Sequence, residues 1–441
     1  MTNKSEKELL GKYKLVLGLE VHIQPKLERK MFCGCKADIW KAEPNTLTCP
    51  TCLGLPGALP VPNEEAVRKT HLLGLALNCA LNRNSRFDRK HYFYPDLPKG
   101  YQISQYKQPL CGEGYLELSS GSRADIERIH LEEDAAKSFH EGKKTLIDFN
   151  KGGLALIELV TKPTFSSIED AVDFGKKLRE VVRALGVSDA DMEKGQMRLE
   201  PNISLRTEEM EKSEELPSYK VEVKNINSFK FMEKVVRAEI IRQRELLEKD
   251  ETPVQENRGF DEKSGKTVSQ RSKEEAHDYR YFPEPDIPPM EFSNEYFEEL
   301  KKSLGDLPGE KTAGLAEKLG ISEEHAQLLV AKDLQKQLEE LVEAGVNAEK
   351  ATKLLLNKKE FQNISVEEFK EKLDSEGDKI SEIGELEGVI QKVIEENSKV
   401  VSDYRSGKKS ALQFLIGMAM KETGGKADAG AVKNMLSEKL V

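Results

Sequence analysis

The sequence has no apolar run long enough to cross a membrane. Its longest two, residues 72–81 and 411–420, fall far short of the roughly 20 residues that a spanning helix needs. Residues 1–13 are polar and carry charges of both signs, so the apolar stretch of a secretory signal peptide is also missing. We therefore expect a cytoplasmic protein that makes no membrane contact and keeps its cysteines reduced.

The sequence also has no excess of positive charge. Its 68 lysines and arginines are outnumbered by 78 acidic residues, which gives a net charge of −10. This balance argues against a surface that coats nucleic acid without specificity, although local basic patches could still bind an RNA. A chain of 441 residues with 38% hydrophobic residues is long enough for two or three domains.

Several common catalytic motifs are missing as well. The nearest approach to a phosphate-binding P-loop runs from Gly259 to Gly265, Lys266 and Thr267, but it has five intervening residues where the motif needs four. Neither a Gly-x-Ser-x-Gly elbow nor a single reactive cysteine with a placed histidine stands out. Any nucleotide is therefore expected to bind in another manner than in P-loop proteins.

Four of the six cysteines form two closely spaced pairs. One residue separates Cys33 from Cys35, two separate Cys49 from Cys52, and thirteen lie between the pairs. Two such hooks can surround a tetrahedral Zn²⁺ with four thiolates, which leaves no open position and predicts a structural site. Disulfides, disfavoured in a reducing compartment, and buried free thiols are the alternatives. Of the other two cysteines, Cys79 lies in an apolar run typical of a core, and Cys111 has no assigned role.

Three predicted strands, at about residues 15–24, 197–205 and 220–224, alternate apolar and polar side chains. Their apolar sides would face a core, so their polar sides carry the residues of interest: Glu20, His22 and Gln24 in the first, Arg198, Glu200, Asn202 and Ser204 in the second, and Lys220, Glu222 and Lys224 in the third. Polar outer faces are common on half-buried strands. Several carboxylates with one histidine, however, suit an oxygen-rich Mg²⁺ site for one or two ions and point to phosphoryl transfer.

The order of elements predicts an α+β protein in three parts. Residues 1–292 mix strands and helices and should form a large mixed-sheet domain with the zinc knot. Residues 293–374 should form an all-α domain, and residues 375–441 a small all-α tail that begins with an acidic, glycine-bearing connector. Cations outnumber acids from residue 401 onward, which fits a mobile RNA-binding tail as well as it fits an ordinary solvated bundle.

A segment rich in cations and aromatic residues, 88–106, is typical of a wall that holds an anionic, planar ligand, although a sheet-edge loop would also fit. Its residue order closely resembles a signature of the B subunits of tRNA-dependent amidotransferases. Further matches to this family, in the family's order, are residues 18–22, 130–135, 223–229, 271–286 and 403–408.

The resemblance implies a mixed-sheet cradle that uses ATP to phosphorylate the side-chain carboxylate of a misacylated tRNA. An amidase (A) subunit, joined with a small C subunit in a heterotrimer, would hydrolyse glutamine and supply ammonia that displaces the phosphate. The complex would thus be a ligase that forms a C–N bond. Glu-tRNA(Gln), Asp-tRNA(Asn) or both could be substrates. The alternatives are a non-catalytic tRNA-binding or assembly subunit, and an archaeal-type homologue whose large extra domain has no room in 441 residues.

The resemblance also implies residue roles. The Mg²⁺ and catalytic residues would be Glu20, His22, Glu200, Glu222 and either Glu132 or Glu133. The motif favours Glu133, whereas strand alternation places Glu132 beside Arg128 and His130. Lys90 would contact phosphate or the acyl carboxylate, with Arg89 and Arg198 as helpers in ATP binding. Many family members have Asp at the position of Glu200.

Overall fold

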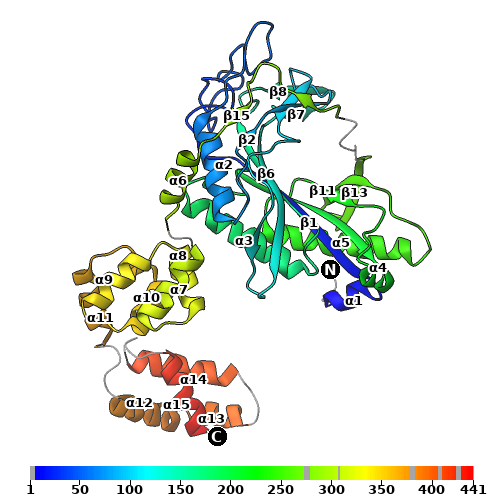
Figure 1. Ribbon diagram of the computed structural model, residues 1–441. Coiled ribbons are helices and arrows are strands. Elements are labelled where there is room, and N and C mark those ends of the chain that lie inside the picture. Colours follow the sequence, from blue (N-terminus) through cyan, green and yellow to red (C-terminus); the bar gives the residue numbers. More distant parts are fainter. Residues whose placement is uncertain are drawn as a thin grey trace. The chain divides into compact units, whose positions relative to one another are not determined.

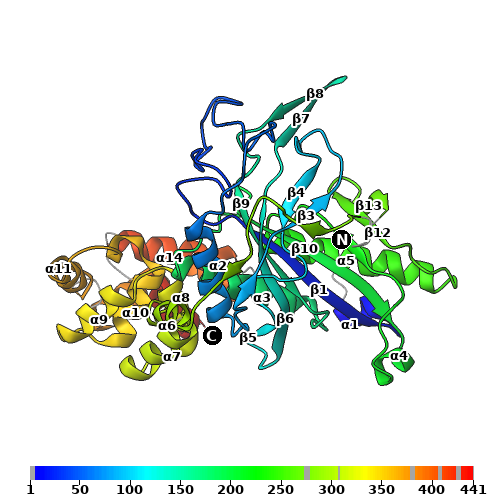
Figure 2. The same cartoon turned by 45° about the horizontal axis from the view of Figure 1, so that its top comes forward.

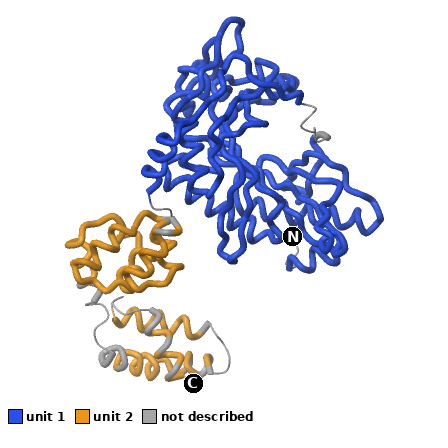
Figure 3. Tube along the Cα trace, in the orientation of Figure 1, with its two compact units in different colours: residues 1–308 blue, residues 309–441 orange. Residues whose placement is uncertain are grey.

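A computed structural model describes residues 5–272, 279–305, 308–377, 383–405, 410–423 and 429–440. Residues 273–278 and 406–408 of the family motifs, and residues 378–382 of the acidic connector, lie outside the described residues. The chain forms two compact units, Met1–Pro308 and Gly309–Val441 (Figure 3). None of the described helices is both long enough and apolar enough to span a bilayer.

The first unit is built on one eight-stranded sheet (Figure 1). Its strand order is β13-β12-β11-β10-β1-β9-β6-β5, and only the β11–β12 pair is parallel. The strands are β1 (Lys14–Ile23), β5 (Gly114–Glu117), β6 (Arg123–Glu133), β9 (Ala155–Thr161), β10 (Met197–Arg206), β11 (Val221–Val223), β12 (Glu256–Asp261) and β13 (Lys266–Ser272).

Three helices cover one face of this sheet: α2 (Glu64–Ala76), α3 (Ile168–Ala184) and α5 (Phe229–Leu247) (Figure 2). The alternating apolar side chains of β1, from Leu15 to Ile23, are almost fully buried beneath them. Because successive side chains of a strand point to opposite faces, this burial leaves the polar residues of β1 and β10 together on the other face.

Smaller elements lie beside the main sheet. A three-stranded sheet joins β3 (Asp88–His91), β4 (Tyr101–Ser104) and β14 (Phe282–Pro283), so segments almost two hundred residues apart pair as neighbours. The remaining strands form the pairs β2 (Asn84–Ser85) with β15 (Met290–Glu291) and β7 (Lys137–Glu141) with β8 (Lys144–Asp148). The other helices of this unit are α1 (Glu6–Leu10), α4 (Glu208–Lys212) and α6 (Asn294–Lys302).

The second unit is helical throughout its described residues, with two hydrophobic clusters. One cluster lies within α7 (Pro308–Leu319), α8 (Glu323–Ala331), α9 (Gln335–Glu343), α10 (Ala348–Asn357), the 3₁₀ helix Lys359–Phe361 and α11 (Val366–Gly377). The other lies within α12 (Ile383–Glu396), α13 (Ser398–Arg405), α14 (Ser410–Glu422) and α15 (Ala429–Leu440).

The expected α+β class, with a large mixed sheet followed by a helical region, is confirmed. Helix α6 packs on α2, where Tyr296 and Phe297 contact the ring of His71, and the first compact unit therefore extends to Pro308. The division at residues 292/293 and 374/375 stays a prediction.

Candidate active site

The polar face of the main sheet gathers acidic side chains from neighbouring strands. Glu20 on β1 lies opposite Glu200 on β10, and two residues along the strand His22 lies opposite Glu158 on β9. Glu158 in turn lies opposite His130 on β6. The antiparallel register, together with the two-residue period, thus brings acids and histidines from four strands into one cluster.

His22 stands at the centre of this cluster. Its Nε2 atom lies 3.6 Å from a carboxylate oxygen of Glu20, 3.7 Å from one of Glu132 and 3.6 Å from one of Glu158. Its Nδ1 atom, buried and without a hydrogen-bond partner, lies 3.8 Å from Glu200. The donors form two overlapping groups of the metal-binding kind, Glu20–His22–Glu200 and His22–Glu132–Glu158, and within each group the ligand atoms lie within 4.8 Å of one another.

The pKa values show that negative charge is crowded here. Removal from water, followed by the charge of Glu158, raises the pKa of Glu20 to about 7. Burial also raises the pKa of Glu132. Removal from water would by itself lower the pKa of His22, but its interaction with Glu158 and the charge of Glu200 raise it to about 9. A divalent cation would relieve this crowding, and the carboxylate oxygens present are the donors that Mg²⁺ prefers, with the His22 imidazole beside them.

Lys224 supplies a fixed positive charge next to the cluster. Its ammonium lies 2.7 Å from Glu200 and 2.6 Å from Glu222. Burial alone would lower the pKa of Lys224, but these two carboxylates raise it. Neither of the two metal-binding groups includes Glu222, which the resemblance places in the Mg²⁺ set; its carboxylate forms an ion pair with Lys224.

The choice between Glu132 and Glu133 follows from the position of each on β6. Glu132 approaches His22 and accepts a hydrogen bond of 3.3 Å from the Ser104 hydroxyl. Glu133 instead contacts the Lys99 ammonium and accepts a 2.9 Å hydrogen bond from the backbone N–H of Ile103. The geometry therefore places Glu132 in the cluster, as strand alternation indicates, and not Glu133, which the motif favours.

Lys90 extends from β3 into the same space as the acids. Its ammonium lies 5.0 Å from the centre of the Tyr279 ring. Burial would lower the pKa of Lys90, but the surroundings, chiefly Tyr281, Glu132 and Glu158, raise it well above its usual value. Lys90 therefore remains positively charged at the wall of the pocket.

The two arginines expected to help in ATP binding are engaged in ion pairs within the protein. Arg89 donates two hydrogen bonds to Glu284, of 2.8 and 2.9 Å, and one of 3.2 Å to Asp286, while its guanidinium lies 4.3 Å from the Tyr101 ring centre. Arg198 lies 3.8 Å from Asp134. Arg89 thus joins β3 to the segment that contains β14, a role that sequence reasoning did not indicate.

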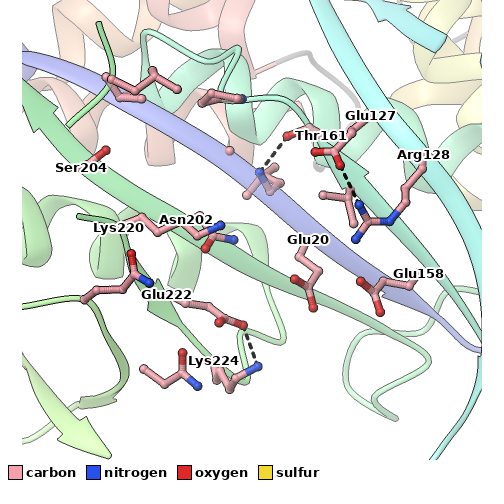
Figure 4. Close-up of a pocket in the computed structure, with 18 of the residues that line it drawn as sticks. Glu20, Glu127, Arg128, Glu158, Thr161, Asn202, Ser204, Lys220, Glu222 and Lys224 are labelled. Atoms are coloured by element: carbon pink, nitrogen blue, oxygen red, sulfur yellow. Dashed lines mark hydrogen bonds and ion pairs between the residues drawn. The ribbon is translucent and has the colours of Figure 1, made fainter. Parts of the chain in front are cut away.

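A pocket of about 710 Å³ opens over the acids (Figure 4). In Figure 4 Glu20 and Glu158 face the same space, with Glu222 and Lys224 beside them. From there the pocket follows β1 and β10 toward Ser204 and is closed by Tyr279 and Tyr281 and by the loop at residues 216–220. Its volume and lining suit a ligand with an anionic part near Glu20 and Glu158 and a larger body along β1 and β10.

Glu158 is the main site residue that sequence reasoning missed. It lies within β9, whose other residues are apolar apart from one threonine, and both its neighbours along the strand are buried. Strands buried on both faces show no alternation, so the only sequence signal was a single carboxylate inside an apolar run.

The four paired cysteines form a second site, in the loop between β1 and α2. The sulfurs of Cys33, Cys35, Cys49 and Cys52 lie within 4.8 Å of one another, and all are free thiols. Hydrogen bonding from Cys33 is the largest effect that lowers the pKa of Cys52, which falls to about 5. Four sulfurs around one point fit a tetrahedral zinc ion.

The other two cysteines are core residues. Cys79 and Cys111 are both buried, and burial raises the pKa of the Cys79 thiol to about 12 and that of Cys111 well above its usual value. Such thiols are neutral and unreactive. This fits the core position expected for Cys79, and Cys111 is a core residue too.

Comparison with known proteins gives consistent matches along the chain. The family model described as "GatB/GatE catalytic domain" matches residues 15–298, and that described as "GatB domain" matches residues 295–440. The B subunit of the aspartyl/glutamyl-tRNA(Asn/Gln) amidotransferase of Thermotoga maritima is 43% identical, over 98% of this chain and 99% of its own length. The proteins of the same name from Persephonella marina and Carboxydothermus hydrogenoformans are 41% and 40% identical, over 96% and 98% of this chain and 99% of their own lengths.

Proposed function

This chain belongs to the GatB family of tRNA amidotransferase B subunits, and we propose that it carries out the ATP-dependent amidation of Glu-tRNA(Gln), Asp-tRNA(Asn) or both. In the proposed first step an oxygen of the side-chain carboxylate attacks the γ-phosphorus of ATP, and ADP leaves. In the second, ammonia attacks the resulting acyl phosphate, inorganic phosphate leaves, and the nitrogen loses a proton. Phosphate is a far better leaving group than oxide, which is why ATP is required.

The observation that carries the proposal is the cluster of carboxylates around His22, two of which, Glu20 and Glu158, line a pocket of about 710 Å³. The groups Glu20–His22–Glu200 and His22–Glu132–Glu158 would hold Mg²⁺, which when bound neutralises phosphate charge. Lys90 adds a positive charge at the wall, where it would orient the transferred phosphate or the acyl carboxylate. Lys224 holds Glu200 and Glu222 in place.

The proposed partners follow from membership of the GatB family. Ammonia would come from a separate amidase (A) subunit that hydrolyses glutamine, with a small C subunit completing a heterotrimer. The second candidate function is a tRNA-binding or assembly subunit with a degenerate site. The gathering of His22 with four carboxylates favours catalysis, because such a cluster is costly to bury without a cation to bind.

Variants of the acidic cluster test the proposal in the reconstituted complex. Glu158→Gln and His22→Ala should lower the ATP hydrolysis that misacylated tRNA stimulates by at least about 100-fold, since each removes a donor from a charge-neutralising site. The matched control is Glu117→Gln, which neutralises an exposed acid on β5 of the same sheet. Wild-type amidation of both tRNAs by Glu158→Gln and His22→Ala would favour the assembly role.

A further inference from the structure

Lys30 is a buried cation that forms no ion pair with a carboxylate of the described residues. It is 1% exposed, and two residues separate it from Cys33 in the first cysteine hook. Its ammonium donates hydrogen bonds to the carbonyl oxygens of Gly152, at 2.7 Å, and Phe149, at 3.3 Å. Among the described residues no Asp or Glu lies within ion-pair distance of it. Lysine is almost never fully buried unless its charge is paired, so this position calls for a source of negative charge.

That negative charge lies next to Lys30, in the four-cysteine site. The Lys30 ammonium is 3.8 Å from the sulfur of Cys52, within the distance of a hydrogen bond to sulfur. Four thiolates around one Zn²⁺ carry a net charge of −2, because four negative charges outnumber the two positive ones. A −2 centre and a buried +1 group thus lie side by side, and each lowers the cost of burying the other.

The turn that Lys30 contacts connects the cysteine site to the main sheet. The backbone N–H of Met31 donates to the Gly153 carbonyl at 2.9 Å, and the N–H of Gly153 donates to the Asp134 carbonyl at 2.9 Å. Gly153 has a φ of +81°, and a Cβ placed there would lie 3.3 Å from Cys52. This turn leads directly into β9, the strand that carries Glu158.

We propose that Lys30 is the built-in counter-charge of a zinc site at the four cysteines, retaining the metal by a charge-assisted hydrogen bond to the Cys52 thiolate. This inference rests on the zinc assignment. Because the same ammonium binds the turn at residues 149–153, bound metal also fixes the start of β9. Groups that hydrogen-bond to metal ligands commonly change metal affinity by about 10- to 100-fold when removed, which sets the size of the expected effect.

A purely structural role for Lys30 would give a different pattern. If Lys30 served only to anchor two backbone carbonyls, a neutral donor would replace it, and its loss would weaken the fold equally with and without metal. Lys30→Gln keeps hydrogen-bond donors but removes the charge, whereas Lys30→Met removes both. Lys36→Met is the matched control, because Lys36 is exposed in the same loop.

The test uses the full-length protein and follows zinc release to a chromophoric chelator, after metal analysis of each variant. Wild type and Lys36→Met should hold about one zinc per chain and release it slowly. Both Lys30→Gln and Lys30→Met should release it at least about 10-fold faster. Their stability deficit relative to wild type should shrink once zinc has been removed from all proteins.

Two results would overturn the inference, and they are distinguishable. Wild-type protein purified without zinc, and unable to take it up, would show that the cysteines are not a zinc site at all. If wild type holds zinc but Lys30→Gln releases it at the wild-type rate, the zinc assignment stands and the proposed role of Lys30 in retaining the metal is wrong. If Lys30→Met fails to fold, the zinc-release rates of wild type and Lys30→Gln still test the proposal.

Discussion

At the residue scale, the centre of the candidate active site is an imidazole surrounded by acids. Each of the four carboxylates near His22 lies within 3.8 Å of one of its nitrogens, but three of them approach the same Nε2 atom. A single proton on Nε2 cannot satisfy all three carboxylates, although Nε2 of His130 lies 3.3 Å from Glu158 and the Ser104 hydroxyl donates to Glu132. A further cation would balance the remaining negative charge. This shortage of positive charge distinguishes the acidic cluster from the ion pair of Arg89 with Glu284, in which the carboxylate accepts two hydrogen bonds from the guanidinium.

A buried histidine away from this cluster, His71, predicts a pH dependence of stability. Its ring packs among Phe292, Tyr296 and Phe297, and burial lowers its pKa from 6.5 to about 4. The unfolded chain therefore takes up a proton below pH 6.5, whereas the folded protein does so only near pH 4, and stability is lost as the pH falls through this window. The contribution of His71 to the free energy of unfolding should drop by about 2 kcal/mol between about pH 7 and pH 5.

Urea unfolding of wild type and His71→Gln at both pH values measures this contribution. Glutamine has a polar side chain but does not titrate, so the variant should lose less stability on acidification than wild type does. Other acids and histidines contribute equally to both proteins and cancel in the difference. An identical loss in the two proteins would mean that His71 is accessible to protons in the folded state.

At the scale of elements, the segment that carries Tyr279 and Tyr281 closes the pocket beside β3. Glu284 is 2% exposed and accepts both donors of the Arg89 fork, and β14 pairs with β3 in antiparallel register. Tyr281 also stacks on Tyr106 with ring centres 4.5 Å apart. The ion pair therefore holds two aromatic walls near Lys90, although neither Arg89 nor Glu284 lines the pocket.

Breaking this ion pair should disturb the pocket wall and spare the acidic cluster. Glu284→Gln leaves the half-buried Arg89 guanidinium with Asp286 as its remaining charge partner, which should cost about 1–3 kcal/mol of stability. We expect the folded variant to show a KM for ATP or tRNA that is raised several-fold and a kcat that changes less. Arg89→Lys should behave similarly, because a lysine cannot reproduce the two-pronged contact. Unchanged steady-state constants in both variants would show that the wall does not depend on this ion pair.

The sequence predicts elements well where a pattern is local. Alternation placed Glu20, His22, Glu200 and Glu222 on the polar faces of their own strands and indicated Glu132 beside His130, and cysteine spacing indicated the four-sulfur cluster. It could not show that residues 282–283 pair with β3, because that contact spans nearly two hundred residues. Nor could it show that Lys224 reaches Glu200 on the neighbouring strand β10, because that contact depends on strand pairing and side-chain packing.

At the scale of the whole molecule, the second unit contains two helical clusters whose cores are separate. Helices α12–α15 have their own buried set, including Ile390, Leu415, Val432 and Leu436. Their removal therefore leaves the core of α7–α11 complete. From residue 401 onward the sequence has seven lysines and arginines but only four acidic residues. This excess of positive charge is the basis for proposing a tRNA-binding tail.

Deleting residues from 378 onward should weaken tRNA binding and leave the fold of the first unit intact. The proposed tail contacts are to tRNA phosphates and not to the reacting carboxylate, so the KM for tRNA should rise more than kcat falls. The salt dependence of binding should become shallower, because fewer counterions are released. Binding curves at several salt concentrations compare the truncated with the full-length protein. Equal affinity and equal salt slope would mean that the tail does not bind RNA.

Transfer of oxygen from the substrate carboxylate to phosphate tests the proposed chemistry most directly. Glu-tRNA(Gln) or Asp-tRNA(Asn) labelled with ¹⁸O in both side-chain carboxylate oxygens is amidated by the reconstituted complex with ATP and glutamine, and the inorganic phosphate is analysed by mass spectrometry. Attack of the carboxylate on the γ-phosphorus predicts one ¹⁸O in phosphate for each amide formed, and an amidation rate at least about 100-fold lower for the Glu158→Gln complex. Amide formed at the full rate with no ¹⁸O in the phosphate would contradict it.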